Sequence, residues 1–194
     1  DQVRIFNKAL TSTEVTTLND EVYCVPTIVP TDNFTPITYT GNGGTQSTNS
    51  LSNQSGTINF KPDFSWIKVR STTNDHTLQN SISGTSKFLR SNTTDAEGSN
   101  IEMVTSYNSN GFSLGPNALA NQSSETYVAW NWKAGGADVQ NTDGTITSQV
   151  SANVDAGFSI VKYTGNNTAG ATVGHKMDAV PELIIWKGLT SVSG

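Results

Sequence analysis

Apolar and polar residues follow a short period along most of the chain after Phe34, and turn residues separate the apolar stretches. Strand-like patterns occur at residues 37–39, 64–69, 107–112 and 127–132. Asn110-Gly111 and Asp143-Gly144 are typical of tight hairpin turns that need a positive φ. These patterns predict an all-β protein, in which β-sandwich or jelly-roll modules follow one another in tandem.

One short helix is predicted near the N-terminus. Thr11 can cap this helix while Glu14 reaches back to it, and Leu10 can pack on Val15. Before the helix, an apolar stretch at residues 3–6 predicts a short strand. Residues 21–33 contain two prolines and no periodic pattern, so we predict a linker there.

An internal repeat divides the rest of the chain. Residues 34–42 (FTPITYTGN) match 158–166 (FSIVKYTGN), and residues 62–68 (PDFSWIK) match 181–187 (PELIIWK) in the same order. Two ordered matches indicate a duplication, with one module at 34–136 and a partial second copy at 137–194. A duplicated sequence keeps its core positions, so we expect the matched blocks to form superposable strands. Tyr39 would then superpose on Tyr163, and Trp66 on Trp186, with both tryptophans in the core.

The second copy lacks a counterpart of the later part of the first. A β-module cut in the middle leaves an unpaired edge and an open core face. We expect either that the natural chain continues beyond Gly194 or that another chain covers this edge, and we favour continuation.

Composition excludes several classes of partner. The chain has 27 Thr, 22 Ser, 20 Asn and 17 Gly among 194 residues, but only 11 Lys and Arg against 16 Asp and Glu, which gives a net charge of -5. Nucleic acid is not expected as a partner, because phosphate binding needs clustered basic residues. No apolar run is long enough to insert into a membrane. The single cysteine, Cys24, excludes an internal disulfide.

Five blocks together carry a resemblance to a known group of proteins: YTGN, PDFSWIK, GFSLG, YVAWNWKAGG and NTDGTITSQV. They resemble a repeated β module of marine bacteriophage virion proteins, which commonly follows a laminin-G-like domain of the concanavalin A type. Residues 1–20 resemble the C-terminal end of such a domain. The resemblance covers essentially the whole chain.

This resemblance implies an extracellular tail or fibre protein of the virion that attaches to the host surface. Its expected partners are other virion proteins, further copies of itself in a homo-oligomer, and a host-surface glycan. The resemblance supplies no catalytic residues and no cofactor. A carbohydrate-binding or adhesion module of a secreted bacterial protein would show the same residues and stays open as an alternative.

Catalytic and metal sites find little support in the sequence. His76 and His175 lie in polar, loop-like settings, and the acidic residues stand mostly beside Gly, Asn or Ser, where they favour turns. We therefore expect no enzyme activity. Asp138, Asn141 and Asp143 could offer oxygen ligands to Ca²⁺, but their spacing matches no EF-hand and a hairpin turn explains them, so we predict no metal site.

The aromatic stretch at residues 127–132 is the most informative candidate site. A period of two places Trp130 and Trp132 on one face of a strand and Tyr127 on the other. Flat rings with a polar handle suit sugar binding, so Trp130, Trp132 and Tyr127 are candidate glycan-binding residues. The competing interpretation, which we favour here, makes the tryptophan face the main core face, because a chain with few large apolar residues must bury its tryptophans.

Overall fold

The computed structural model describes residues 8–22 and 30–190. Its helices are α1 (Ser12–Val22), the 3-10 helix η1 (Pro30–Asp32) and α2 (Ala118–Asn121). The strands are β1 (Phe34–Thr40), β2 (Gln46–Ser47), β3 (Ser52–Ser55), β4 (Phe64–Val69), β5 (Thr77–Asn80), β6 (Lys87–Phe88), β7 (Gly98–Ser99), β8 (Val104–Asn108), β9 (Gly111–Leu114), β10 (Thr126–Trp132), β11 (Val139–Asn141), β12 (Ser148–Asn153) and β13 (Phe158–Tyr163).

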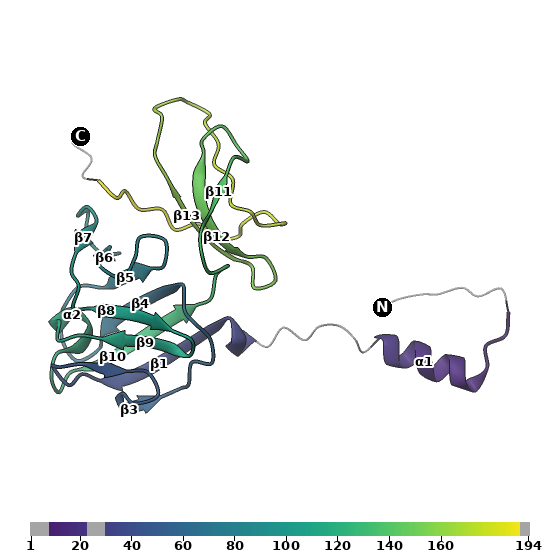
Figure 1. The fold of residues 1–194 in the computed structure, drawn as a ribbon, viewed down its shortest axis with the longest axis horizontal. Coiled ribbons are helices and arrows are strands. Elements are labelled where there is room, and N and C mark those ends of the chain that lie inside the picture. Colours follow the sequence, from purple (N-terminus) through teal and green to yellow (C-terminus); the bar gives the residue numbers. More distant parts are fainter. Residues whose placement is uncertain (1–7, 23–29, 191–194) are drawn as a thin grey trace.

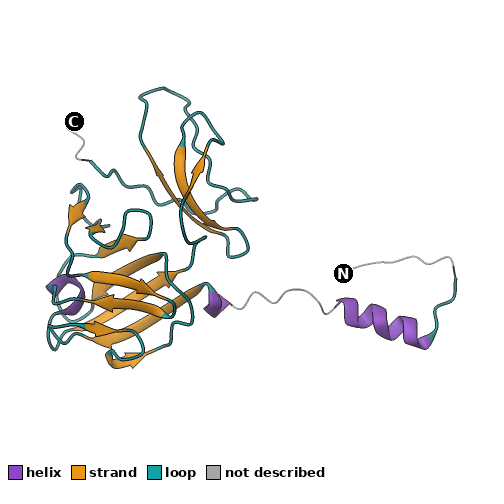
Figure 2. Ribbon diagram, in the orientation of Figure 1, coloured by secondary structure: helices purple, strands orange, loops and turns teal. Residues whose placement is uncertain are grey.

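Two antiparallel sheets form a β-sandwich between Phe34 and Trp132 (Figures 1 and 2). The first sheet has five strands in the order β3-β1-β10-β4-β5, and the second has three in the order β2-β9-β8. Buried side chains from both sheets and from α2 share one core, among them Ile37, Ile67 and Phe112. The all-β prediction is therefore confirmed.

Strand β10 occupies the centre of the larger sheet and is bonded along both edges. Its residues pair with β1 from Phe34↔Trp132 to Thr40↔Thr126 and with β4 from Phe64↔Trp132 to Val69↔Tyr127. Since side chains opposite one another in paired strands point to the same face, these two ladders align three strands into common rows. These rows determine which side chains point inward to the core and which lie on the outer face of the sheet.

Two stacked tyrosines fill the middle of the core. The rings of Tyr39 and Tyr127 lie 5.2 Å apart with an interplanar angle of 11°. Each hydroxyl donates to a carbonyl at α2, Tyr39 to Ala120 and Tyr127 to Ala118, both at 2.7 Å. Burial raises the pKa of Tyr39 well above its ordinary value, so the phenol stays neutral and acts as a donor. The hydroxyl groups of these two buried tyrosines thus hold α2 against the core.

A buried amide, Asn121, joins two loops and strand β2 at one end of the sandwich. Its Nδ2 donates to the carbonyls of Gly44 at 2.7 Å and Gly115 at 2.9 Å. Its Oδ1 accepts from Nε2 of Gln46 at 2.6 Å and from the backbone N–H of Asn42 at 3.0 Å. Buried polar groups must be satisfied in this way, and here one side chain satisfies backbone groups from separate loops.

Both predicted turns are present. The β8–β9 hairpin closes with the pair Asn108↔Gly111, so the two loop residues are 109 and 110. Gly111 has a φ of +132°, and a Cβ there would stand 1.9 Å from Oγ1 of Thr48. Gly144, with a φ of +99°, lies in the turn between β11 and β12. Glycine is required at position 111 both by its φ and by the closeness of Thr48.

The N-terminal helix confirms the predicted capping box. Oε2 of Glu14 accepts from the backbone N–H of Thr11 at 2.9 Å, and Oγ1 of Thr11 accepts from the N–H of Glu14 at 3.3 Å. The helix continues to Val22, so residues 21 and 22 belong to it rather than to the predicted linker. The strand predicted at residues 3–6 lies outside the described residues.

The second copy of the repeat agrees with the first only in part. Residues 158–163 form β13, as expected, in a three-stranded sheet with the order β11-β12-β13. Residues 181–187 form no strand, and Trp186 is 69% exposed. The expectation that Trp66 and Trp186 are both core residues is therefore wrong, because Trp66 is half-buried on the face of β4 opposite the core. The offset of the two blocks also aligns Trp186 with Ile67 rather than with Trp66.

Two hydrogen bonds of the β11-β12-β13 sheet and one buried carboxylate of the sandwich hold the segment between them. Asn153 on β12 donates to Oδ1 of Asn33 at 2.9 Å, and Oγ of Ser151 donates to the carbonyl of Gly136 at 2.9 Å. The buried carboxylate of Asp63 accepts from the backbone N–H groups of Ala134 at 2.9 Å and Gly136 at 3.3 Å. These contacts hold the connection that leaves β10.

Replacing Asn121 with alanine tests the loop junction. We expect a loss of about 3 kcal/mol in the free energy of unfolding, because several buried backbone groups would lose their partner at once. Denaturant unfolding measures this change. Gln122→Ala is the matched control, since the neighbouring side chain is exposed and its removal should cost less than about 0.5 kcal/mol. Equal stabilities for the two variants would contradict the assignment.

Candidate functional site

Strand β10 presents two different faces, and the structure assigns them opposite to our expectation. Tyr127 and Ala129 are fully buried in the sandwich core, whereas Trp130 and Trp132 are half-buried on the outer face of the sheet. The interpretation of the tryptophan face as the main core face is therefore wrong. Tyr127 is also wrong as a glycan-binding residue, because its ring is enclosed and its hydroxyl is bonded within the protein.

The physical reason is that the core can be filled without tryptophan. The tyrosine pair supplies large rings, and the third inward residue, Asn131, is buried with its amide satisfied. Its Nδ2 donates to the carbonyl of Thr35 at 3.1 Å and its Oδ1 accepts from Oγ of Ser65 at 2.7 Å. A strand can therefore point a polar residue into the core when that residue finds such hydrogen-bond partners.

The outer face of the five-stranded sheet carries an aromatic cluster, which we call the outer aromatic face. Its members come from three adjacent strands and lie in the rows set by the ladders: Phe34 on β1, Trp130 and Trp132 on β10, and Phe64 and Trp66 on β4. All five are half-buried. Their neighbours Pro36 and Thr38 on β1 extend the face toward the edge, and Pro36 is exposed.

The first row consists of three rings in register. Trp132 lies 4.7 Å from Phe34 and 5.3 Å from Phe64, measured between ring centroids. Phe158, at the start of β13, stacks on Trp132 at 5.9 Å with an interplanar angle of 20°. The β11-β12-β13 sheet therefore covers part of this row, and Trp132 serves as the contact between that sheet and the five-stranded sheet.

The second row has no such cover from β13. Trp130 and Trp66 meet edge to face, with centroids 6.1 Å apart and an interplanar angle of 72°. Nε1 of Trp66 donates to Nδ1 of His76 at 2.8 Å, which fixes the Trp66 ring. Among the described residues, the indole N–H of Trp130 has no hydrogen-bond partner. Trp130 thus combines an accessible ring with a donor available to a ligand.

This arrangement suits one kind of chemistry. A half-buried indole beside the exposed Pro36 offers flat apolar area, and a polar N–H lies at its edge. The nearby Asp75 carboxylate is held by Arg90 at 3.2 Å, and Asn92 donates to it at 2.7 Å. The face can stack on the apolar side of a ring-shaped ligand such as a sugar.

His76 has an electrostatic role in this face. Burial and the charge of Lys68 lower the pKa of His76, and the neighbouring Asp75 opposes this effect. The neutral ring is the form in which Nδ1 can accept a hydrogen bond from the Trp66 indole N–H. The bond from Trp66 therefore depends on His76 remaining uncharged.

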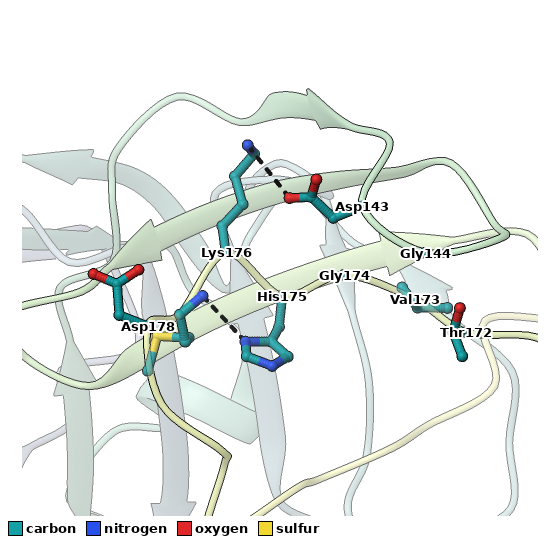
Figure 3. A pocket seen from close by; sticks show the side chains of 9 residues that line it. Asp143, Gly144, Thr172, Val173, Gly174, His175, Lys176 and Asp178 are labelled. Carbon is teal, nitrogen blue, oxygen red and sulfur yellow. Dashed lines mark hydrogen bonds and ion pairs between the residues drawn. The ribbon is translucent and has the colours of Figure 1, made fainter.

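The second histidine lies in a separate hollow lined by residues 143–144 and 172–178 (Figure 3). Nδ1 of His175 accepts from the backbone N–H of Met177 at 3.1 Å, and Lys176 faces Asp143 across the hollow with 3.9 Å between Nζ and Oδ2 (Figure 3). Of the calcium candidates, Asn141 accepts from the N–H of Asp143, and Asp138 is exposed. In residues 8–22 and 30–190, no three His, Cys, Asp or Glu side chains gather into a metal site.

The outer aromatic face could be found from the sequence only in part. Its β10 and β4 tryptophans stand out by their alternation, but Phe34 and Phe158 come from distant segments. The contact of His76 with Trp66 depends on the antiparallel pairing of β4 with β5, so no local motif reports it.

Comparison with known proteins gives a family but no activity. Residues 29–193 match the model of a family described as a domain of unknown function (DUF7483). No curated protein and no solved structure is significantly similar to the chain. Where the structure describes helices, none is both long enough and apolar enough to span a bilayer.

Protonation of His76 should weaken the outer aromatic face. A lowered pKa in the folded state means that the stabilisation is complete above the ordinary value of 6.5 and is lost as the pH falls through the lowered pKa. We expect the melting temperature to fall as the pH drops below the ordinary pKa of 6.5. In His76→Asn, which keeps an acceptor but does not titrate, this step should be absent. If the fall in melting temperature with pH were unchanged in His76→Asn, it would arise from the titration of another group.

Replacing Trp132 and Trp130 with alanine, one at a time, should show how much each ring contributes to the stability of the fold. Trp132 is packed among three phenylalanine rings, so its removal should cost about 3 kcal/mol in the free energy of unfolding. Trp130 is half-buried and meets only the Trp66 ring among the described aromatic contacts, so its loss should cost less, about 1 kcal/mol. Thermal or denaturant unfolding measures both. A larger loss for Trp130→Ala would contradict the account of the two rows.

Proposed function

The chain belongs to the DUF7483 family, and we propose that it is a noncatalytic attachment module that binds a surface glycan through its outer aromatic face. The single observation that carries this proposal is Trp130, a half-buried indole in a fixed aromatic row whose N–H has no partner among the described residues. Rigid aromatic rings bind with a small loss of conformational entropy, which favours them on recognition surfaces.

The setting that we propose for this module is the virion of a bacteriophage, as a tail or fibre component outside the particle. The resemblance of the repeated blocks to marine phage virion proteins supports this setting. In it, other virion proteins and further copies of the chain are the structural partners, and the glycan belongs to the host surface.

The absence of catalysis is proposed from the way the reactive groups are used. Nδ1 of His76 accepts from Trp66, and Nδ1 of His175 accepts from a backbone N–H. Asp63 is committed to two backbone N–H groups, and Asp75 and Asp95 are paired with Arg90. General acid–base chemistry needs groups that converge on one cleft. These groups instead hold separate parts of the protein together.

A binding experiment on bacterial surface polysaccharides tests the proposed function. The purified chain should bind at least one member of a lipopolysaccharide and capsule array, and Trp130→Ala should weaken that binding by about tenfold or more, which is about 1.4 kcal/mol. Trp186→Ala is the matched control, because it removes an exposed tryptophan elsewhere and should leave glycan binding unchanged.

Two further measurements make the result decisive. Trp130→Ala should keep its circular dichroism spectrum and melt close to the parent, so that lost binding reflects the surface and not unfolding. Polysaccharide incubated with the parent chain should show no new reducing ends. Binding that survives Trp130→Ala, or cleavage of the glycan, would contradict the proposal.

A further inference from the structure

Beside its two aromatic rows, the outer face of the five-stranded sheet has a third row, which carries positive charge. The β10–β4 ladder pairs Val128 with Lys68, so the Lys68 side chain lies on the same face as Trp66 and Trp130. Successive outward residues of one strand are about 7 Å apart. Lys68 is therefore next to the tryptophan row, on the side opposite the phenylalanine rings of the first row.

The turn that follows β4 holds the Lys68 ammonium group in position. Its Nζ donates to the carbonyls of Val69 at 2.6 Å and Thr72 at 3.4 Å. An ammonium group has three N–H donors, so one of them remains for a ligand. A charge that is already fixed loses less conformational entropy when a ligand binds to it.

A second basic side chain, Arg70, follows two residues after Lys68. Its backbone N–H donates to the carbonyl of Thr126 at 2.7 Å, so the antiparallel pairing of β4 with β10 continues through it. Alternation along the strand then directs the Arg70 side chain to the outer face, where it is exposed. Among the described residues, neither Lys68 nor Arg70 forms an ion pair.

His76 adds a neutral donor to the third row. The β4–β5 ladder pairs Ile67 with Thr77, and continuing it by one position brings His76 opposite Lys68. Because Nδ1 of the neutral ring accepts from Trp66, the proton of the ring is on Nε2. In residues 8–22 and 30–190, Nε2 of His76 bonds to no other group, so its N–H is available to a ligand.

The polar groups available on this part of the face are thus donors and cations. Two carboxylates border it, and both have partners within the protein. Asp75 pairs with Arg90 at 3.2 Å, and Glu125 accepts from the hydroxyl of Ser71. A ligand that complements this surface must be rich in acceptors and negatively charged, even though the chain as a whole has a net charge of -5.

We propose that the glycan bound by the outer aromatic face is acidic and carries a carboxylate on its sugar ring. This inference rests on the proposed function and names the ligand class of the same site. The apolar side of the sugar would stack on Trp130, and its carboxylate would accept from Nζ of Lys68 and Nε2 of His76. A carboxylate bonded directly to the ring lies at the ring edge, within the spacing of about 7 Å between neighbouring rows.

Three carboxylated polysaccharides serve as probes: polygalacturonate, hyaluronan and polysialic acid. Each is compared with its carboxyl-reduced form, in which a hydroxymethyl group replaces the carboxylate, in binding to the full chain of 194 residues. At least one probe should bind, and its reduced form should bind about tenfold more weakly or worse. Salt should weaken the binding of the carboxylated form more than that of the reduced form, because ions screen the attraction between charges.

Variants of the two basic residues connect this preference to the third row. The double variant Lys68→Gln/Arg70→Gln should lose about tenfold in affinity for the carboxylated probe and lose the preference for it over the reduced form. Lys68→Arg/Arg70→Lys keeps both charges and should retain the preference. Lys8→Gln/Lys87→Gln is the matched control, because it removes the same charge outside the outer aromatic face and should bind as the parent does.

Several outcomes would overturn this inference. In one, none of the three probes binds, or the reduced forms bind as tightly as the carboxylated ones. In another, the Lys68→Gln/Arg70→Gln variant keeps the preference for the carboxylate. Tighter binding of dextran sulfate than of all three probes would show a general anion site instead.

Failure of this inference and failure of the proposed function give different results. Glycan binding that Trp130→Ala leaves intact would contradict the proposed function itself. Binding to neutral polysaccharide that is lost in Trp130→Ala but unchanged in the Lys68→Gln/Arg70→Gln variant would contradict the acidic ligand alone.

Discussion

The pairing of β10 along both of its edges is the constraint on which the rest of the structure depends. Its thirteen ladder positions with β1 and β4 align three strands, and this alignment decides which side chains share a face. The inner face receives Tyr127 and Ala129, and the outer face receives Trp130 and Trp132. One strand therefore builds the core with half of its residues and the proposed binding surface with the other half.

The small polar residues that dominate the composition have a structural use in this fold. Asn121 and Asn131 are fully buried, and each satisfies backbone carbonyls of other segments. Asp63 does the same for the backbone N–H groups that follow β10. A core of this kind needs fewer large apolar residues, because loops are fixed by directional bonds. It also frees the tryptophans for the outer face.

Local patterns predicted the strands well and their faces poorly. Strand β4, the β8–β9 hairpin and the capping box of α1 follow from periodicity and turn chemistry at neighbouring positions. The side of β10 that faces inward depends on contacts with Tyr39 and Ser65, which lie far away in sequence. Side-chain hydrophobicity alone predicted that the tryptophans, not the tyrosine, would be buried. The strand expected at residues 181–187 is missing for a related reason. A strand needs a bonded neighbour, which its own sequence cannot provide.

The position of β10 in the chain has a consequence for the order of synthesis. It is the last strand of the first module to be made, yet its place is in the middle of the sheet, so β1 must wait until Trp132 has left the ribosome. Folding that depends on such distant pairing is slow, and the nascent chain exposes open strand edges during the delay. Such a chain is a natural client for chaperones.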